Sequence, residues 1–224
     1  MSANLIPILW ESTLLTLYMV AMSTVLGTLI GAPLGIFLAT SRRGELLSAP
    51  VLNTVLGLVV NAARSTPFII LVVAIIPLTR LIAGTSIGST AAIVPLTIAA
   101  APFIARLIET AIREVDAGLI EAARAMGATP GQIVRKVLIP EAMPGIILGL
   151  TLAVVSLIGY SAMVGAVGGG GLGDLGIRYG YQRFMPEVML AVVVILILLV
   201  QAVQSLGEWI ASRFDKRAPR NRGR

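Results

Sequence analysis

Long stretches without a charged residue are the feature that most restricts how this chain can fold. No Asp, Glu, Lys or Arg occurs in five runs, which cover residues 12–39, 65–79, 81–105, 142–173 and 188–207. A helix needs about 20 mostly apolar residues to cross a hydrocarbon layer roughly 30 Å thick, and one central Arg or Asp would cost about 2.5 to 3.5 kcal/mol. Because 57% of the residues are apolar and only 12% are charged, these runs predict an all-α, polytopic membrane protein with five spans.

A further uncharged segment, residues 46–63, could be mistaken for a sixth span. Counting it would leave only Arg64 to connect two spans, too short a connection to reverse a helix. With five spans and the N-terminus outside, Arg80, Arg178 and Arg183 lie outside. Most other basic residues then lie inside, as the positive-inside rule requires: Arg42, Arg43, Arg106, Arg113, Arg124, Arg135, Lys136 and the tail from Arg213 to Arg224. We therefore interpret 46–63 as a cytoplasmic approach to the second span.

The charge pattern sets the expected organisation of the chain. The predicted transmembrane domain covers 12–210, with an outer N-terminus before it and a basic cytoplasmic tail after it, over 1–11 and 211–224. Its spans are 12–39, 55–80, 86–112, 142–166 and 187–208, and the cytoplasmic loop is 113–141. Proline removes a backbone donor and clashes with the preceding turn, so Ser65, Thr66 and Pro67 should mark a kink. No cleavable signal peptide is visible, and the first span is expected to remain in the mature protein.

Composition also excludes several classes of function. The chain has no Cys and no His, which removes thiolate chemistry and the commonest metal ligand, and no catalytic, metal or cofactor residues are predicted. It has no phosphate-binding loop of the Gly-x-x-x-x-Gly-Lys-Ser/Thr type, so ATP, with its Mg²⁺, would have to bind a separate ATPase subunit. The net charge of +6 follows from topology and the tail, and predicts contact with anionic lipid rather than nucleic acid.

The loop between the third and fourth predicted spans is polar, basic and rich in helix-end signals. Asp116 can cap a short helix through Leu119, Ile120, Ala123 and Met126, and Gly127 can end it. The following Thr129, Pro130 and Gln132 form a second helix start, which Pro140 should stop. Glu121 could present its carboxylate to a basic partner or pair with Arg124 on the same helix. The loop therefore has the build of a docking element.

The sequence Glu121-Ala122-Ala123, followed by Gly127 and by Ile139-Pro140, resembles the EAA signature of permease subunits of ATP-binding-cassette importers. The similarity covers nearly the whole chain. Three segments resemble methionine importer permeases in particular: the stretch that begins RSTPFIILVVAIIPLTRLIAG, the loop IEAARAMGATPGQIVRKVLIPEAMPG and the run GYSAMVGAVGGGGLG.

This resemblance implies a type I importer transmembrane fold, with five spans and a cytoplasmic coupling helix, in the bacterial inner membrane. Two copies would form the passage, two ATPase subunits would drive it, and a lipid-tethered binding protein would deliver methionine. The implied coupling residues are Glu121, Ala122, Ala123, Arg124 and Gly127. Glu121 is expected to meet a basic residue of the ATPase.

A glycine-rich run, GAVGGGGLGDLG over residues 165–176, follows the fourth span. Such a run allows close helix approach, a tight re-entrant turn or a backbone-lined passage. The resemblance implies that Tyr160, Ser161 and Met163 lie near the dimer axis, where the passage closes. Met163 suits a gate because its thioether repacks easily, but it would equally suit a filled core.

Three alternatives to a methionine importer stay open at this point. A related importer of another amino acid or of a quaternary amine such as betaine would share the EAA loop and the glycine-rich turn. A carrier or channel made of this chain alone would transport without ATP, and an inert scaffold would not transport at all. The methionine assignment depends on the resemblance, because nothing in the composition recognises a thioether.

Overall fold

The computed structural model describes residues 5–42 and 45–214, in which all regular secondary structure is helical. The helices are, in chain order, α1 (Leu5–Thr40), α2 (Pro50–Ser65), α3 (Phe68–Ala74), α4 (Ile76–Ala83), α5 (Ser89–Arg113), α6 (Ala117–Ala125), α7 (Pro130–Ile133), α8 (Ile139–Ala166), α9 (Gly171–Leu175) and α10 (Pro186–Phe214). Two π-helical turns, Val134–Leu138 and Gly176–Tyr181, follow α7 and α9. The all-α class is confirmed.

Four of the helical segments are long and apolar enough to cross a bilayer: α1, α5, the stretch Pro130–Ala166, and α10. The pair α2 and α3 passes the same test together, but it is bent by 100° at the break between its helices. Counting that pair as one broken span gives five, the number that the uncharged runs predict.

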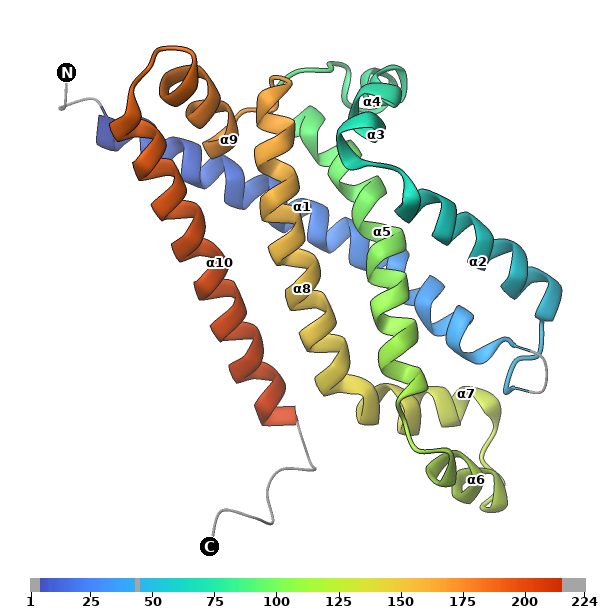
Figure 1. Cartoon of the computed structure of the whole chain (residues 1–224). Helices are drawn as coiled ribbons and strands as arrows, with labels where there is room; N and C mark the ends of the chain where they lie inside the picture. Colours follow the sequence, from blue (N-terminus) through green and yellow to red (C-terminus); the bar gives the residue numbers. More distant parts are fainter. Residues whose placement is uncertain (1–4, 43–44, 215–224) are drawn as a thin grey trace, which may run out of the picture.

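The longest contact in the bundle lies between α1 and α5, which cross along most of their lengths (Figure 1). Gly27, Gly31 and Gly35, spaced four apart on α1, form the contact face. A Cβ at Gly31 would lie 2.6 Å from the Ala101 carbonyl oxygen, and one at Gly35 would lie 2.4 Å from that of Ala105. Small residues let two backbones approach closely in a membrane, so this glycine row fixes α1 against α5.

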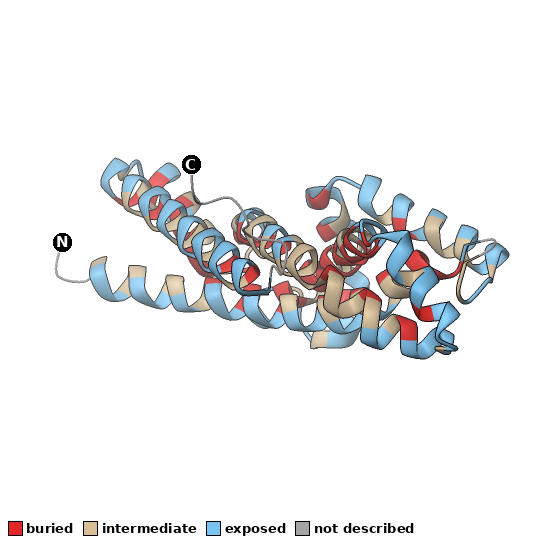
Figure 2. Cartoon of the chain, turned by 90° about the horizontal axis from the view of Figure 1, so that it is seen from below, coloured by how far each residue is buried: buried red, intermediate tan, exposed pale blue. Residues whose placement is uncertain are grey.

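Buried residues gather where α1, α5 and α8 meet, while outward faces stay exposed (Figure 2). Fully buried Leu96 and Ile104 of α5 and Leu157 of α8 belong to this core. The outer faces of α1, α2, α3 and α10 are instead exposed and apolar, as helices require that face lipid or another subunit. The ends of the bundle differ, since α3, α4 and α9 lie at one end and α6 and α7 at the other (Figure 1).

Pro140 does not stop the helix that begins at Pro130, so that expectation is wrong. The chain continues through the π-helical turn Val134–Leu138 into α8. In this turn Ile139 N–H donates to Val134 O, one residue further back than in an α-helix. The wider turn leaves room for the proline ring, and Pro140 has no N–H that needs an acceptor. The helix therefore starts well before residue 142, where the fourth span was expected to begin.

Other helix ends also lie outside the expected span limits. The first helix begins at Leu5 rather than at residue 12, and α10 extends to Phe214 rather than to residue 208. The expected second span, 55–80, is divided among α2, α3 and α4. Residues 1–4, 43–44 and 215–224 lie outside the described residues, and with them the start of the predicted outer N-terminus and most of the predicted basic tail.

Candidate functional site

The helix α6 forms as its sequence predicts. The Asp116 carboxylate accepts a hydrogen bond from Gly118 N–H at 2.7 Å and caps the helix. At the other end, Gly127 has a φ of +78°, and its N–H donates to Arg124 O at 2.9 Å. A left-handed residue of this kind ends many helices and favours glycine. Both predicted ends of the short helix are therefore confirmed.

The connection from α6 to α7 is equally tight. Gln132 N–H donates to the Thr129 hydroxyl, and the Gln132 side chain accepts from Thr129 N–H at 2.9 Å, which completes a reciprocal capping box. The loop between the two helices is therefore a defined corner.

The predicted docking residues lie on different faces of α6. Ala123 is only 3% exposed and packs into the core with Ile133 and Leu138. Glu121, Ala122 and Arg124 are exposed. Ala123 therefore anchors the helix to the bundle, and its two neighbours on each side are free to meet another protein.

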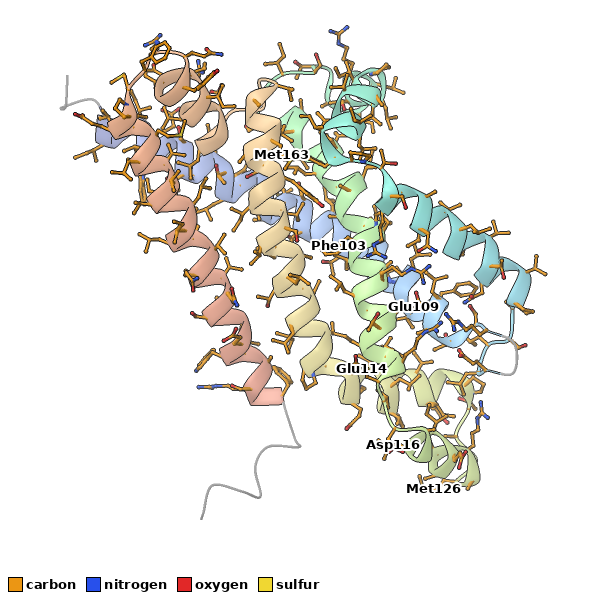
Figure 3. All side chains as sticks on the ribbon, viewed as in Figure 1. Phe103, Glu109, Glu114, Asp116, Met126 and Met163 are labelled. Atoms are coloured by element: carbon orange, nitrogen blue, oxygen red, sulfur yellow. The ribbon has the colours of Figure 1, made fainter. Side chains whose placement is uncertain are left out.

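Met126 adds an apolar contact point that the sequence interpretation treated as part of the helix interior. It is 81% exposed at the extreme tip of the molecule, next to Gly127 (Figure 3). An exposed large apolar side chain that belongs to no core is typical of an interaction surface. The exposure of Met126 could have been predicted from the sequence, because Met126 directly precedes a glycine with the features of a helix end.

The alternative in which Glu121 pairs with Arg124 is not found. Among the ion pairs of residues 5–42 and 45–214, none involves either side chain. Both charges are exposed, so they are available to groups outside the chain.

A cluster of charges that sequence analysis missed lies towards the α6 end of α5. Glu109, 4% exposed, pairs with Arg106 at 2.5 Å and with Arg113 at 2.6 Å, both on the same helix. Arg42, beyond the end of α1, approaches it at 3.6 Å. The sequence could have indicated this cluster, because Arg106 and Arg113 lie three residues before and four residues after Glu109 on one helix.

The arginines of this cluster also bond to neighbouring helices. Arg106 donates to Gly57 O and to Asn61 Oδ1 on α2, at 3.1 and 2.9 Å. Arg113 donates to Leu38 O on α1 at 3.2 Å. Together with the ion pairs, these bonds join α1, α2 and α5 around the single Glu109 carboxylate.

The predicted kink residues lie at the break between α2 and α3. Ser65 is the last residue of α2, and Thr66 and Pro67 connect it to Phe68. The Ser65 and Thr66 hydroxyls donate back to the carbonyls of Asn61 and Ala62, at 2.9 and 3.2 Å. Both hydroxyls therefore bond back to the last turns of α2 rather than across the break. The bend of 100° at this point is sharper than the kink within one helix that the proline suggested.

The three candidate gate residues of α8 point in different directions. Tyr160 stacks on Phe68, with ring centroids 4.4 Å apart. Ser161 is 2% exposed, and its hydroxyl donates to Ile158 O at 2.7 Å, so it lies in the core. Met163 is 46% exposed near the end of α8 away from α6 (Figure 3). Of the three, Tyr160 and Met163 are the ones whose side chains are available outside the core.

The glycine-rich run makes a tight turn that folds α9 back along α8. Three of its glycines, Gly168, Gly170 and Gly171, have φ between +75° and +89°. A Cβ at Gly173 would lie 2.4 Å from Ala162 O. Leu172 N–H donates to the Thr16 hydroxyl of α1 at 2.9 Å. Close packing explains this run, so the glycines hold α9 against α1 and α8.

A broken-helix bundle with a capped, exposed helix at one end defines a class of multi-pass membrane permeases, and comparisons with known proteins agree. Residues 31–218 match the family described as binding-protein-dependent transport system inner membrane component. The chain belongs to this family and is a permease subunit of an importer, not an enzyme.

The chain is also similar to individual curated permeases. The chain is 56% identical over 210 residues to the probable D-methionine transport system permease protein MetI of Vibrio cholerae, which covers 94% of this chain and 93% of that one. It is 54% identical over 156 residues to the D-methionine transport system permease protein MetI of Escherichia coli, with 70% of each chain covered.

Solved structures show the same architecture. An inward-facing conformation of the MetNI methionine ABC transporter matches with a TM-score of 0.94 at 49% identity, over 96% of this chain and all of that one. An amino acid ABC transporter solved with histidines matches with a TM-score of 0.77 at 22% identity, over 92% and 94% of the two chains. The second likeness concerns the fold alone, and the first confirms the type I importer fold.

Proposed function

We propose that this chain is the permease subunit of an ATP-driven importer that carries methionine across the cytoplasmic membrane. Two copies form the passage, and two separate ATPase subunits bind ATP and Mg²⁺. Support comes from relatives named as D-methionine permeases along nearly the whole chain and from the close likeness to a methionine ABC transporter.

The observation that carries this proposal is that α6 has one face buried in the bundle and one face exposed. Ala123 ties the helix to the core of the bundle, while Glu121, Ala122, Arg124 and the tip residue Met126 are exposed. A partner that grips the exposed face can therefore move the bundle through the buried one. We assign this face to the ATPase, with Glu121 paired to a basic residue there and Met126 in an apolar hollow.

The orientation that fits this role puts α6 and α7 in the cytosol and the N-terminus outside. The opposite end, with α4 and α9 (Figure 1), then receives the extracytoplasmic binding lipoprotein. Arg124, Arg135 and Lys136 lie on the cytosolic side in this arrangement, as the positive-inside rule favours. A cysteine placed at Ala125 should react only with reagents added from the cytosolic side, and labelling from outside intact cells would contradict this orientation.

The mechanism is alternating access driven from α6. Closure of the ATP-bound subunits shifts α6, and the shift passes into α8 because α7, the π-helical turn and α8 form one continuous helix. The far end of α8 carries Tyr160 and Met163, the residues assigned to the closure of the passage. Hydrolysis returns the assembly to the inward-open state.

Charge reversal at Glu121 tests the coupling role. Glu121→Lys should lower methionine uptake at least about tenfold, the effect of losing roughly 1.4 kcal/mol at a protein contact, while ATP hydrolysis continues. Radiolabelled uptake and phosphate release are measured in liposomes that hold the permease, the ATPase and the binding protein. Glu208→Lys, on the exposed face of α10, is the matched control and should transport normally. Normal uptake by Glu121→Lys would contradict the assignment.

The same vesicles separate this function from its alternatives. Uptake that continues without ATP, or by this chain alone, would indicate a carrier or channel. Uptake of another amino acid or of betaine in preference to methionine would indicate a related importer. The absence of any transport by the complete assembly would leave only a scaffold.

A further inference from the structure

A cavity opens where the broken span of α2 and α3 meets the middle of α5 and α8. Its volume is about 240 Å³. Pockets for drug-sized ligands measure roughly 300 to 1,000 Å³, so this one suits a smaller solute. Its walls include one cation, two hydroxyl groups and three aromatic rings, which come from Arg64, Thr66, Phe68, Phe103 and Tyr160.

Arg64 is the only charged side chain in this cavity, and it has no counter-ion. Its guanidinium carbon lies 5.9 Å from the ring centroid of Phe103, and no ion pair within residues 5–42 and 45–214 includes it. Phe103 lies near the middle of α5 (Figure 3), so Arg64 is close to mid-depth of the bundle. An ionised residue at that depth is costly and usually marks a solute pathway.

The course of α2 explains how Arg64 reaches this position. Arg64 lies within the expected second span, 55–80, directly before the residues predicted to form a kink. Because α2 continues to Ser65 and the bend follows it, the arginine is carried along α2 to the cavity. A guanidinium without a carboxylate partner is available to an anionic group that enters from outside the chain.

The opposite side of the cavity is aromatic. Phe68 and Tyr160 stack with an interplanar angle of 12°, which holds both rings in place. Phe103 adds a third ring next to Arg64. Aromatic rings attract sulfur in a thioether side chain and also attract an ammonium group over their faces.

We propose that this cavity is a transit site for the transported α-amino acid. Arg64 pairs with the substrate's carboxylate, and the rings of Phe68, Phe103 and Tyr160 receive its apolar side chain. The proposal extends the proposed function and rests on it. Since none of the residues that line the cavity is a carboxylate that could hold the ammonium group, binding is weak, as a site that must release its solute requires.

Protection of a cysteine provides a direct test, because the chain has no cysteine of its own. Ala99→Cys places one thiol in the cavity wall. In the reconstituted complex with its ATPase, methionine should slow the reaction of this thiol with a maleimide. Methioninol, the amino alcohol that lacks the carboxylate, should not. Ala117→Cys, in the exposed first turn of α6, is the control and should react at the same rate with either compound.

A second test replaces the guanidinium group of Arg64. Arg64→Gln in the Ala99→Cys chain should raise the methionine concentration for half-protection about tenfold or more, the loss expected for one charge-assisted contact. Arg64→Lys should lie between. Arg80→Gln, which removes an arginine bonded to Ser86 outside the cavity, should change nothing. If Arg64→Gln does not assemble, Phe103→Leu serves instead, and it should weaken protection by methionine.

The outcomes separate the transit site from the proposed function. Uptake of methionine by the Ala99→Cys complex without any protection of the thiol would overturn the transit site alone. Equal protection by methioninol would overturn the role of Arg64. Failure of the complete, unmodified assembly to take up methionine would instead overturn the proposed function.

Discussion

Two arginine-containing regions beside α5 use the guanidinium group in opposite ways. Around Glu109, three arginines converge on one buried carboxylate and also bond to backbone and side-chain oxygens of α1 and α2. Against Phe103, earlier on the same helix, Arg64 faces aromatic rings and no carboxylate. The first region satisfies its charges within the chain, and the second leaves one unsatisfied.

This difference indicates which charges hold helices together and which are kept for a solute. A buried carboxylate with several donors is lost only with a large penalty, because its partners remain buried and uncompensated. An arginine that contacts only a ring contributes little to folding. Stability measurements on matched variants therefore distinguish the two regions.

The largest effect is expected at Glu109. Glu109→Gln removes the carboxylate that three mutually repelling guanidinium groups share, and we expect a loss of about 3 kcal/mol, the lower end for breaking a buried pair. Thermal or denaturant unfolding of the detergent-purified permease would measure it. Glu208→Gln, on the exposed face of α10, is the matched control and should change stability by less than about 0.5 kcal/mol. Similar values for both variants would mean that the cluster does not hold α1, α2 and α5 together.

The aromatic stack should rank second. Phe68→Leu keeps an apolar side chain but removes the ring that faces Tyr160, and a stacked pair contributes about 1 kcal/mol beyond buried area. The same substitution at Phe103, which is half-buried and stacks on no ring of the described part of the chain, should cost less. A larger loss at Phe103 than at Phe68 would show that the cavity wall depends on the lone ring rather than on the stack.

Arg42 should matter less than its partner carboxylate. It is half-exposed and 3.6 Å from Glu109, so Arg42→Gln should cost less than about 1 kcal/mol, as exposed ion pairs do. The difference should shrink further in about 1 M salt, where charges are screened within roughly 3 Å. Unfolding measured at low and high salt would check this, and a loss that salt leaves unchanged would mean that Arg42 is buried in the assembly.

The smallest effect on stability is expected at Arg64. Removing one exposed cation–π contact by Arg64→Gln should cost no more than about 0.5 kcal/mol. Uptake of methionine by the same variant should nevertheless fall, because the transit site loses its cation. A stability loss as large as that of Glu109→Gln would break the comparison and make Arg64 a structural residue.

The short helix α6 could be predicted closely because residues next to its ends determine where it starts and stops. Asp116, Gly127, Thr129 and Gln132 each act within a few residues of themselves, and their hydrogen bonds are those that the sequence suggested. Likewise, uncharged length was enough to predict a helical membrane fold with five spans. Signals of this kind need no knowledge of distant contacts.

The contacts of the charged regions could not be predicted from local sequence signals. Glu109 lies within α5, and the oxygens that its arginines reach, on Leu38, Gly57 and Asn61, are distant in sequence. A kink after Arg64 was predicted from Pro67, but local sequence could not show that the bend would be 100° or that Arg64 would come to lie against Phe103 of α5. Pro140 was misinterpreted because only the π-helical turn before it makes a proline acceptable there.

The uninterrupted run from Pro130 to Ala166 turns the polypeptide itself into a lever. At 1.5 Å per residue, its 37 residues form a rod about 55 Å long. If the cytosolic end pivots by only about 5°, geometry displaces the opposite tip by roughly 5 Å, more than the width of a methyl group and comparable to one helical turn. A small movement that the proposed ATPase partner produces at the cytosolic end would therefore become a larger displacement on the other side of the bilayer.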